Sequence, residues 1–577
     1  MQRSILLLMF IISLLPARLS LANDTTFTFI AHYRQDVPVT LDISTNAEVS
    51  TLDPALATDV VSTDIIENLF IGLTDLDPIS GHVVPKLATH WETSDDGLTW
   101  TFHLRSDVLW QRYGPSTGAI EKLRPVVAED VVYGIKRACD PRLNGYYGTV
   151  AAQIIAGCDV VNNATEATDT LVYGETIGVM APDPATVIIT LQFPASYFLA
   201  MTPLWMLRPV PKETISTYGD EWTRPGTIVT NGPYFVDEVT RGIQRVFVQN
   251  PRYPADLRSG DGNIERVKAV IVEDSGTAFA LYQDHRLDAA GIPAAELQGM
   301  LGDTVYNKQI RQVFDLSVFY FGFMHDKPPF DNVHVRRAFS AIVDREAFIT
   351  QVRSGLGLPM IHFTPPSIRH APPINEIGIG FDPDYALSQL AEAGYPNCEG
   401  LPPIQILTYA GAGTWGEFLA AAAERHLGCT LDSFTVEQVE FSVLLRLIDT
   451  DTPLQDRPHI WTLGWSPNYP DANNFLGDVL GCTNTNRFRR PCSEVDTLLD
   501  QAAREQDPTL RDELYAEVEQ AFFGEIGLFP IVPLYTRADY ILIQPWYTGP
   551  FETDGIFTGV HWDARRIDMA AKLAAQA

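Results

Sequence analysis

Basic residues are scarce in this chain of 577 residues, where 41 Lys and Arg stand against 72 Asp and Glu and give a formal net charge of −31. Nucleic-acid binding needs basic patches that displace counterions from phosphates, so this balance argues against a nucleic-acid partner. The excess of acidic residues instead predicts a solvated acidic surface. Low-complexity tracts and internal repeats are also lacking.

Long apolar runs are lacking too. The apolar stretch Ile5 to Leu15 is ended by Pro16 and Arg18, well short of the ~20 residues that a membrane-spanning helix needs. Residues 1–22 have an early basic residue, an apolar centre and a small-x-small end, which is typical of a secretory signal peptide cleaved after about Ala22. We therefore expect an exported, soluble protein of the periplasm or the extracellular space.

Catalytic signatures are missing from the sequence, which contains no GxSxG, HExxH, GxxxxGK[ST] or helix-opening GxGxxG motif. The twelve His are scattered without paired-ligand spacing. We expect neither an enzyme nor a metal or other cofactor. An enzyme on this chain would have to assemble its site from residues far apart in sequence.

Cysteine is rare, and the six Cys contain no CxxC redox spacing. An even number in an exported chain favours disulfides over metal ligation, although six Cys allow 15 pairings and the sequence does not choose among them. Pairing of sequence neighbours predicts three structural disulfides, namely Cys139–Cys158, Cys398–Cys429 and Cys482–Cys492.

Hydrophobic patterning indicates a mixed α and β chain, too long for one core and divided into about three packing units. Alternating or β-branched runs predict strands at residues 100–104, 186–191, 245–248 and 267–272. Helical periodicity predicts helices at residues 129–138, 333–352, 414–427, 493–504 and 508–523. Ser493 and Asp496 resemble a capping box, and Asp507 with Pro508 an N-cap followed by Pro at the first helical position.

Several blocks stand in consistent order along nearly the whole chain after residue 22. They are Ser50-Thr-Leu-Asp-Pro54, residues 64–73, residues 85–105 with the run Trp-Glu-Thr-Ser-Asp-Asp-Gly-Leu-Thr-Trp, residues 128–133, residues 224–234, residues 327–345, residues 364–366 and residues 464–476. Together these blocks resemble one family, the bacterial extracellular solute-binding proteins, family 5. These are the oligopeptide- and dipeptide-binding proteins of ABC importers. The resemblance is specific for the family and much less so for the ligand.

The resemblance implies a fold of class α/β with two hinged lobes, like the periplasmic binding proteins, and an extra subdomain in the first lobe. Family topology places residues 23–58, 208–316 and 532–577 in lobe I, residues 59–207 in the extra subdomain and residues 317–531 in lobe II. Ligand contacts from both lobes exist only when the lobes close, so binding favours the closed form.

The segment GWSPNYPDANNFLG, residues 464–477, matches the part of the family's peptide binders whose strand pairs with the ligand backbone. By resemblance Gly464, Trp465 and Ser466 form that strand, and Val60 offers backbone groups from the opposite lobe. Peptide-binding relatives usually carry Asp at the position of Asn468, where it meets the ligand's α-ammonium. Asp471 could compensate, or could belong to an ordinary Tyr-Pro-Asp turn. Asn468, Asn473 and Asn474 could likewise be plain turn residues.

We therefore expect a non-catalytic, monomeric receptor that passes a peptide or peptide-like solute to the permease subunits of an ABC importer. Relatives with this fold also bind metal chelates, haem, glutathione, opines or sugars, and Asn468 adds weight to such non-peptide solutes. An enzyme or a sensory subunit that has kept this architecture is the remaining alternative.

Overall fold

The computed structural model describes residues 37–577 except 294, 484–485 and 555–558, and the expected signal peptide, residues 1–22, lies outside the described residues. Helices and strands alternate along the chain, so the predicted mixed α/β class is confirmed. Within the described ranges, no helix is both long enough and apolar enough to cross a membrane.

Strands of residues 40–271 form two four-stranded sheets, together with the smaller sheets β10-β6-β7 and β2-β3, whose strands are β2 (Thr74–Leu76), β3 (Val83–Pro85), β6 (Leu109–Gly114), β7 (Ala119–Pro125) and β10 (Val229–Thr230). The first has the order β1-β13-β12-β11, and its parallel pair joins the N-terminal strand to one more than 200 residues later. The second has the order β4-β5-β9-β8 and buries alternate residues of β5 and β9. The strands are β1 (Thr40–Thr45), β4 (Ala88–Thr93), β5 (Thr99–Leu104), β8 (Val179–Asp183), β9 (Thr186–Thr190), β11 (Tyr234–Thr240), β12 (Gln244–Gln249) and β13 (Arg266–Ile271).

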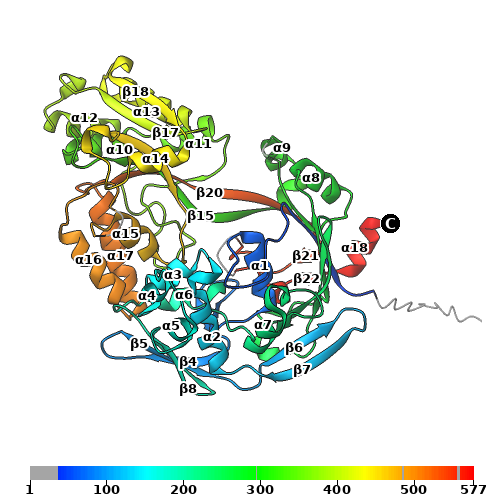
Figure 1. Ribbon diagram of the computed structural model, residues 1–577. Coiled ribbons are helices and arrows are strands. Elements are labelled where there is room, and N and C mark those ends of the chain that lie inside the picture. Colours follow the sequence, from blue (N-terminus) through cyan, green and yellow to red (C-terminus); the bar gives the residue numbers. More distant parts are fainter. Residues whose placement is uncertain (1–36, 294, 484–485, 555–558) are drawn as a thin grey trace, which may run out of the picture. The chain divides into compact units, whose positions relative to one another are not determined.

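A longer sheet has the order β14-β20-β15-β19-β17-β18 and contains two long antiparallel strands that lie side by side (Figure 1). Their register shifts between the pairs Phe314–Ala538 and Val318–Thr536, where three residues of β15 lie opposite one residue of β20. Such a bulge bends a strand and interrupts its ladder. The strands are β14 (Ala289–Gly291), β15 (Ile310–Phe323), β17 (Ile404–Tyr409), β18 (Phe434–Val439), β19 (Ile460–Trp465) and β20 (Ile531–Ile543).

Helices fill the intervals between these strands. In residues 60–302 they are α1 (Val60–Leu69), α2 (Ala128–Ala138), α3 (Gly148–Ala152), α4 (Cys158–Asn162), α5 (Asp169–Tyr173), α6 (Phe198–Met201), α7 (Lys212–Tyr218), α8 (Ser275–Gln283) and α9 (Leu297–Gly302). In residues 333–576 they are α10 (Val333–Ala341), α11 (Arg345–Val352), α12 (Pro383–Glu392), α13 (Gly413–Leu427), α14 (Phe441–Leu447), α15 (Ala472–Leu480), α16 (Glu494–Arg504), α17 (Pro508–Phe523) and α18 (Met569–Gln576).

The predicted caps of α16 and α17 are present. Ser493 and Asp496 form a capping box, and Asp507 accepts hydrogen bonds from the backbone of Thr509 and Leu510. The single helix predicted over residues 333–352 is wrong, because the chain breaks after Ala341. Asp344 caps a new helix there by accepting a hydrogen bond from the Ala347 amide at 2.9 Å.

Candidate functional site

A cavity of about 510 Å³ lies beside the end of β19, and we call it the strand-edge cavity. Three of the residues that the sequence singled out line it, namely Val60, Ser466 and Asn468. The others come from the start of α1, the loop before α3, the segment after α6, β15, the segment after β19 and β20: Thr58, Asp59, Thr63, Tyr146, Tyr147, Trp205, Val313, Leu316, Ser317, Pro467, Arg537 and Asp539. Residues more than 400 positions apart therefore meet around one space.

The backbone of β19 has a free edge at this end. β19 pairs with β15 along all six of its residues but with β17 only at Ile460 and Trp461. In the described part of the chain, no strand pairs with the β17-side edge of residues 462–465. An unpaired strand edge is a template for another extended chain, and peptide receptors use it in this way.

Gly464 is required here by packing. It lies opposite Phe319 of β15, and a Cβ atom at this position would lie 2.7 Å from the Phe319 ring. Gly464 lines neither this cavity nor the second one described below. A larger side chain would push β19 away from β15, so Gly464 fixes the position of the strand end that carries Ser466.

The N-terminus of α1 faces the same cavity. Val60, the first residue of α1, is 64% exposed although it is apolar. Asp59 caps the helix, accepting hydrogen bonds from the Ser62 amide at 2.8 Å and the Ser62 hydroxyl at 2.7 Å. Burial raises the pKa of the Asp59 carboxyl, but the hydrogen bonds from Ser50 and Ser62 lower it further, so the net pKa lies below its usual value. The rim therefore carries an ionised carboxylate next to the exposed Val60.

A second cavity, of about 310 Å³, is lined by Trp465, and we call it the Trp465 cavity. Asn468 lines both cavities, so the two meet at this residue. The remaining lining comes from the segment around α3, from α6 and the residues before it, and from α15 and the residues before it: Val150, Gln153, Ile154, Phe193, Tyr197, Met201, Tyr469 and Asp478.

Asn474 holds this arrangement together. Its Oδ1 atom accepts hydrogen bonds from Trp465 Nε1 and from the Asn468 amide, both at 3.0 Å, and its Nδ2 atom donates to Asp478 at 2.8 Å. The sequence offered Asn474 as a turn residue, whereas it lies in α15 and is fully buried. Trp461, by contrast, belongs to the core, where it stacks on Phe488.

Asp471 belongs to the scaffold. Its carboxylate is fully buried, caps α15 through the Asn473 amide and receives two hydrogen bonds of 2.7 Å from Arg511 of α17. It lines neither cavity. With both oxygens committed to Arg511, it is not placed to compensate for Asn468 as the sequence had suggested.

Asp478 is the carboxylate that sequence reasoning missed. Its Oδ2 atom accepts hydrogen bonds from Tyr469 Oη at 2.9 Å and Asn474 Nδ2 at 2.8 Å, while Asn473 Nδ2 lies 3.4 Å from Oδ1. Burial raises the pKa of the Asp478 carboxyl to about 6, although those hydrogen bonds act to lower it. The available signal was its position one helical turn after Asn474, within the segment already singled out.

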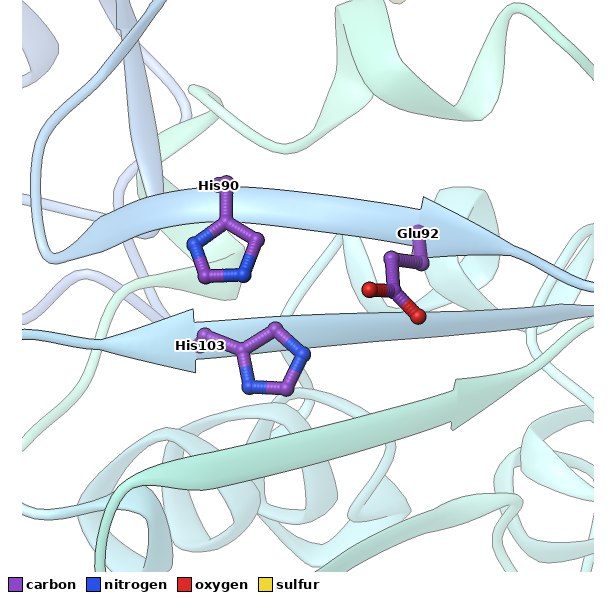
Figure 2. A group of neighbouring side chains, drawn as sticks. All are labelled: His90, Glu92 and His103. Atoms are coloured by element: carbon purple, nitrogen blue, oxygen red, sulfur yellow. The ribbon is translucent and has the colours of Figure 1, made fainter.

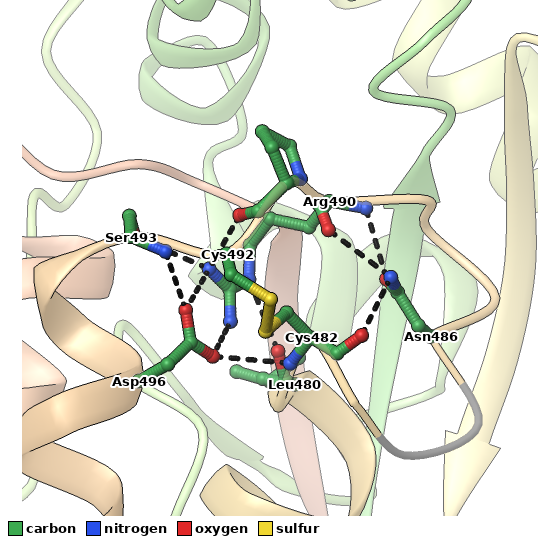
Figure 3. Close-up of a disulfide and its surroundings, with 8 residues drawn as sticks. Leu480, Cys482, Asn486, Arg490, Cys492, Ser493 and Asp496 are labelled. Carbon is green, nitrogen blue, oxygen red and sulfur yellow. Dashed lines mark hydrogen bonds and ion pairs between the residues drawn. A yellow bond between two sulfur atoms is a disulfide. The ribbon is translucent and has the colours of Figure 1, made fainter.

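The three predicted disulfides are all present. Cys139–Cys158 joins the end of α2 to the start of α4 and closes a loop that carries lining residues of both cavities, from Tyr146 to Ile154. Cys482–Cys492 lies between α15 and α16, where Asp496 accepts hydrogen bonds from Arg490 and from the Cys482 amide (Figure 3).

One group of side chains with metal-ligand chemistry is exposed on the β4–β5 surface. The rings of His90 and His103 stack with centroids 4.4 Å apart, and Glu92 lies two residues further along β4 (Figure 2). The group could hold an ion but lines neither cavity. A larger cavity of about 1000 Å³, between residues 79–82, 366–377 and 508–516, contains none of the residues predicted to bind ligand.

Comparison with known proteins identifies the family. Residues 82–487 match the model of the bacterial extracellular solute-binding proteins, family 5, and the chain belongs to this family. It is 28% identical over 532 residues to the periplasmic oligopeptide-binding protein OppA of Salmonella typhimurium, covering 90% of this chain and 91% of the relative. It is 27% identical over 534 residues to the probable deoxycholate-binding periplasmic protein YgiS of Escherichia coli, covering 90% and 93%.

The fold agrees with that assignment. The unliganded open form of MppA, a periplasmic murein tripeptide binding protein, superposes with a TM-score of 0.76 at 24% identity, covering 92% of this chain and 96% of that one. The chain therefore has the two-lobe fold of the periplasmic binding proteins, as the sequence predicted.

Proposed function

We propose that this protein is a periplasmic receptor that captures a peptide or peptide-like solute in the strand-edge cavity and delivers it to the permease of an ABC importer. Family membership and the relatives' printed names support a periplasmic binding protein. We further propose cleavage of the signal peptide after about Ala22, a monomeric state and the absence of catalytic activity.

The free edge of β19 carries the ligand assignment. An extended peptide added to the edge formed by Gly464, Trp465 and Ser466 would bond through its main chain, which makes recognition independent of side-chain identity. The exposed Val60 lines the same cavity from the start of α1. A solute bound there touches both groups at once.

Closure couples binding to transport in this proposal. We assign residues 23–58, 208–316 and 532–577 to lobe I, residues 59–207 to its extra subdomain and residues 317–531 to lobe II. With these boundaries, the chain passes from lobe I to lobe II within β15 and returns to lobe I at the start of its partner strand β20. A ligand that contacts both lobes stabilises the closed form, and the importer recognises that form. The bulge between Phe314 and Val318 lies where these strands border the cavity.

A non-peptide solute is the second candidate, and Asn468 favours it. An α-ammonium that faces an amide in place of a carboxylate loses a charge-assisted hydrogen bond worth about 1.5–3 kcal/mol. The printed name of YgiS, a probable deoxycholate-binding periplasmic protein, also supports a solute other than a peptide. Native mass spectrometry of freshly purified protein would identify a retained solute of either kind.

We expect Asn468→Asp to tighten the binding of tetra-alanine by about tenfold or slightly more, because a gain of about 1.5 kcal/mol comes from restoring a carboxylate opposite the α-ammonium. N-acetylated tetra-alanine lacks that charge and should gain nothing, or lose affinity through an unpaired enclosed carboxylate. Isothermal titration of both peptides against both proteins measures the difference. Equal effects on the two peptides would remove Asn468 from the ligand terminus, and failure of the wild type to bind either would favour the non-peptide solute.

A further inference from the structure

The Trp465 cavity contains a carboxylate without a cation. Asp478 accepts its short hydrogen bonds from an uncharged phenol and an uncharged amide, and both go to Oδ2. Oδ1 receives one long contact, 3.4 Å from Asn473. Over the residues that the structure describes, no Lys, Arg or His forms an ion pair with Asp478, although the nearby Asp471 has Arg511.

The walls of this cavity are aromatic. Trp465, Tyr197 and Tyr469 all line it, and the rings of Tyr197 and Tyr469 stack on each other with centroids 5.2 Å apart and an interplanar angle of 9°. Aromatic faces attract cations, with the strongest effect for Trp and where water is excluded. A half-buried carboxylate with aromatic walls combines the two kinds of group that hold an ammonium ion.

The carboxylate is also held in place. Asn474 forms hydrogen bonds with Asp478, with Trp465 and with the Asn468 backbone, so it connects the Asp478 carboxylate to the end of β19. Asp478 is therefore positioned relative to any solute that pairs with that strand. The raised pKa of Asp478, caused by burial, is consistent with a site that lacks its counter-ion.

We propose that the Trp465 cavity is a subsite for a single ammonium group of the solute, with Asp478 as its counter-ion and Trp465 and Tyr197 as its walls. The proposal rests on the proposed function, because it names the charge of the solute that binds beside β19. It places the anionic contact on α15, ten residues after Asn468. The ammonium could belong to the solute's amino terminus or to a basic side chain, and the two sources are separated below.

The test compares wild type with Asp478→Asn, which keeps an acceptor for Tyr469 and removes the charge, and with Asp478→Glu, which retains the charge. The probes are tri-alanine, N-acetyl tri-alanine, and N-acetylated tripeptides with lysine or norleucine in the middle position. Asp500→Asn on α16 is the matched control, because Asp500 is exposed and its loss changes the net charge equally.

We expect Asp478→Asn to lower the affinity for a probe whose ammonium group binds in the subsite, tri-alanine or the lysine peptide, by roughly tenfold to a hundredfold, as for loss of a charge-assisted hydrogen bond. The affinity for the two probes without an ammonium group, N-acetyl tri-alanine and the norleucine peptide, should stay unchanged. A loss confined to tri-alanine assigns the subsite to the amino terminus, and a loss confined to the lysine peptide assigns it to a side chain. Asp478→Glu should retain part of the affinity, and Asp500→Asn all of it.

If Asp478→Asn lowers the affinity equally for the lysine and norleucine peptides, and equally for free and acetylated tri-alanine, the subsite is overturned while the proposed function stays in place. If no peptide binds wild type, the peptide function fails instead. The subsite is then tested with n-butylammonium, followed by the chemical shift of the Asp478 carboxyl carbon. A shift that saturates in wild type supports it, and no shift contradicts it.

Discussion

Replacing Arg511 by Met should lower the free energy of unfolding by about 3–5 kcal/mol, because it leaves the Asp471 carboxylate buried without its partner. Asp471 is fully buried and receives both guanidinium hydrogen bonds at 2.7 Å. The same carboxylate caps α15, the helix that carries Asn474 and Asp478. Denaturant unfolding followed by circular dichroism measures the loss.

The control for this prediction is Arg504→Met on α16. Arg504 pairs with Asp500 on an exposed helix face, and such pairs contribute about 0–1 kcal/mol. The double variant Asp471→Asn/Arg511→Met should recover part of the stability lost in Arg511→Met, because the unpaired charge is gone. A loss below 1 kcal/mol in Arg511→Met, or no recovery in the double variant, would show that the pair does not hold this segment.

Removal of the Cys139–Cys158 disulfide, as Cys139→Ser/Cys158→Ser, should cost about 3 kcal/mol of stability and also weaken ligand binding. The bridge closes a loop of sequence separation 19, and in the chain-entropy model such a cross-link restricts the unfolded chain. Binding should weaken because the loop supplies Tyr146 and Tyr147 to one cavity and Val150 and Ile154 to the other. Thermal unfolding and titration with tri-alanine measure the two effects.

The matched control is Cys398→Ser/Cys429→Ser. That bridge has a sequence separation of 31 and should cost a comparable amount of stability, yet its loop lines neither cavity. Ligand affinity should therefore change in the first variant and stay the same in the second. Equal affinity in both would mean that the loop around α3 does not need the bridge to form the site.

Local signals in the sequence predicted much of the secondary structure because they act over one or two turns. The capping box at Ser493 and the Asp507-Pro508 start set the beginnings of α16 and α17 where expected. The break between α10 and α11 was missed because apolar periodicity continues across it. Asp344, which caps α11, was present in the sequence but was not recognised as a helix start.

The site was less accessible to sequence reasoning because it depends on pairings across long separations. Family resemblance selected Val60, Ser466 and Asn468, and the structure places all three around one cavity. The resemblance did not reveal that Arg511, 40 residues after Asp471, donates hydrogen bonds to the Asp471 carboxylate. Nor could any spacing show that Tyr197, from the segment before α6, stacks on Tyr469 and lines the same cavity as Asp478. These contacts follow from packing between elements, which no local pattern encodes.

The most direct test of the account is amide hydrogen exchange at residues 462–466, with and without the solute that native mass spectrometry finds bound or the tightest binder among the peptides above. If the solute adds to the free edge of β19, amides in this segment become protected when it binds, while the amides of β18 at the outer edge of the same sheet exchange as before. Saturating solute that leaves residues 462–466 exchanging at their unliganded rate would contradict strand addition and, with it, the assignment of this cavity.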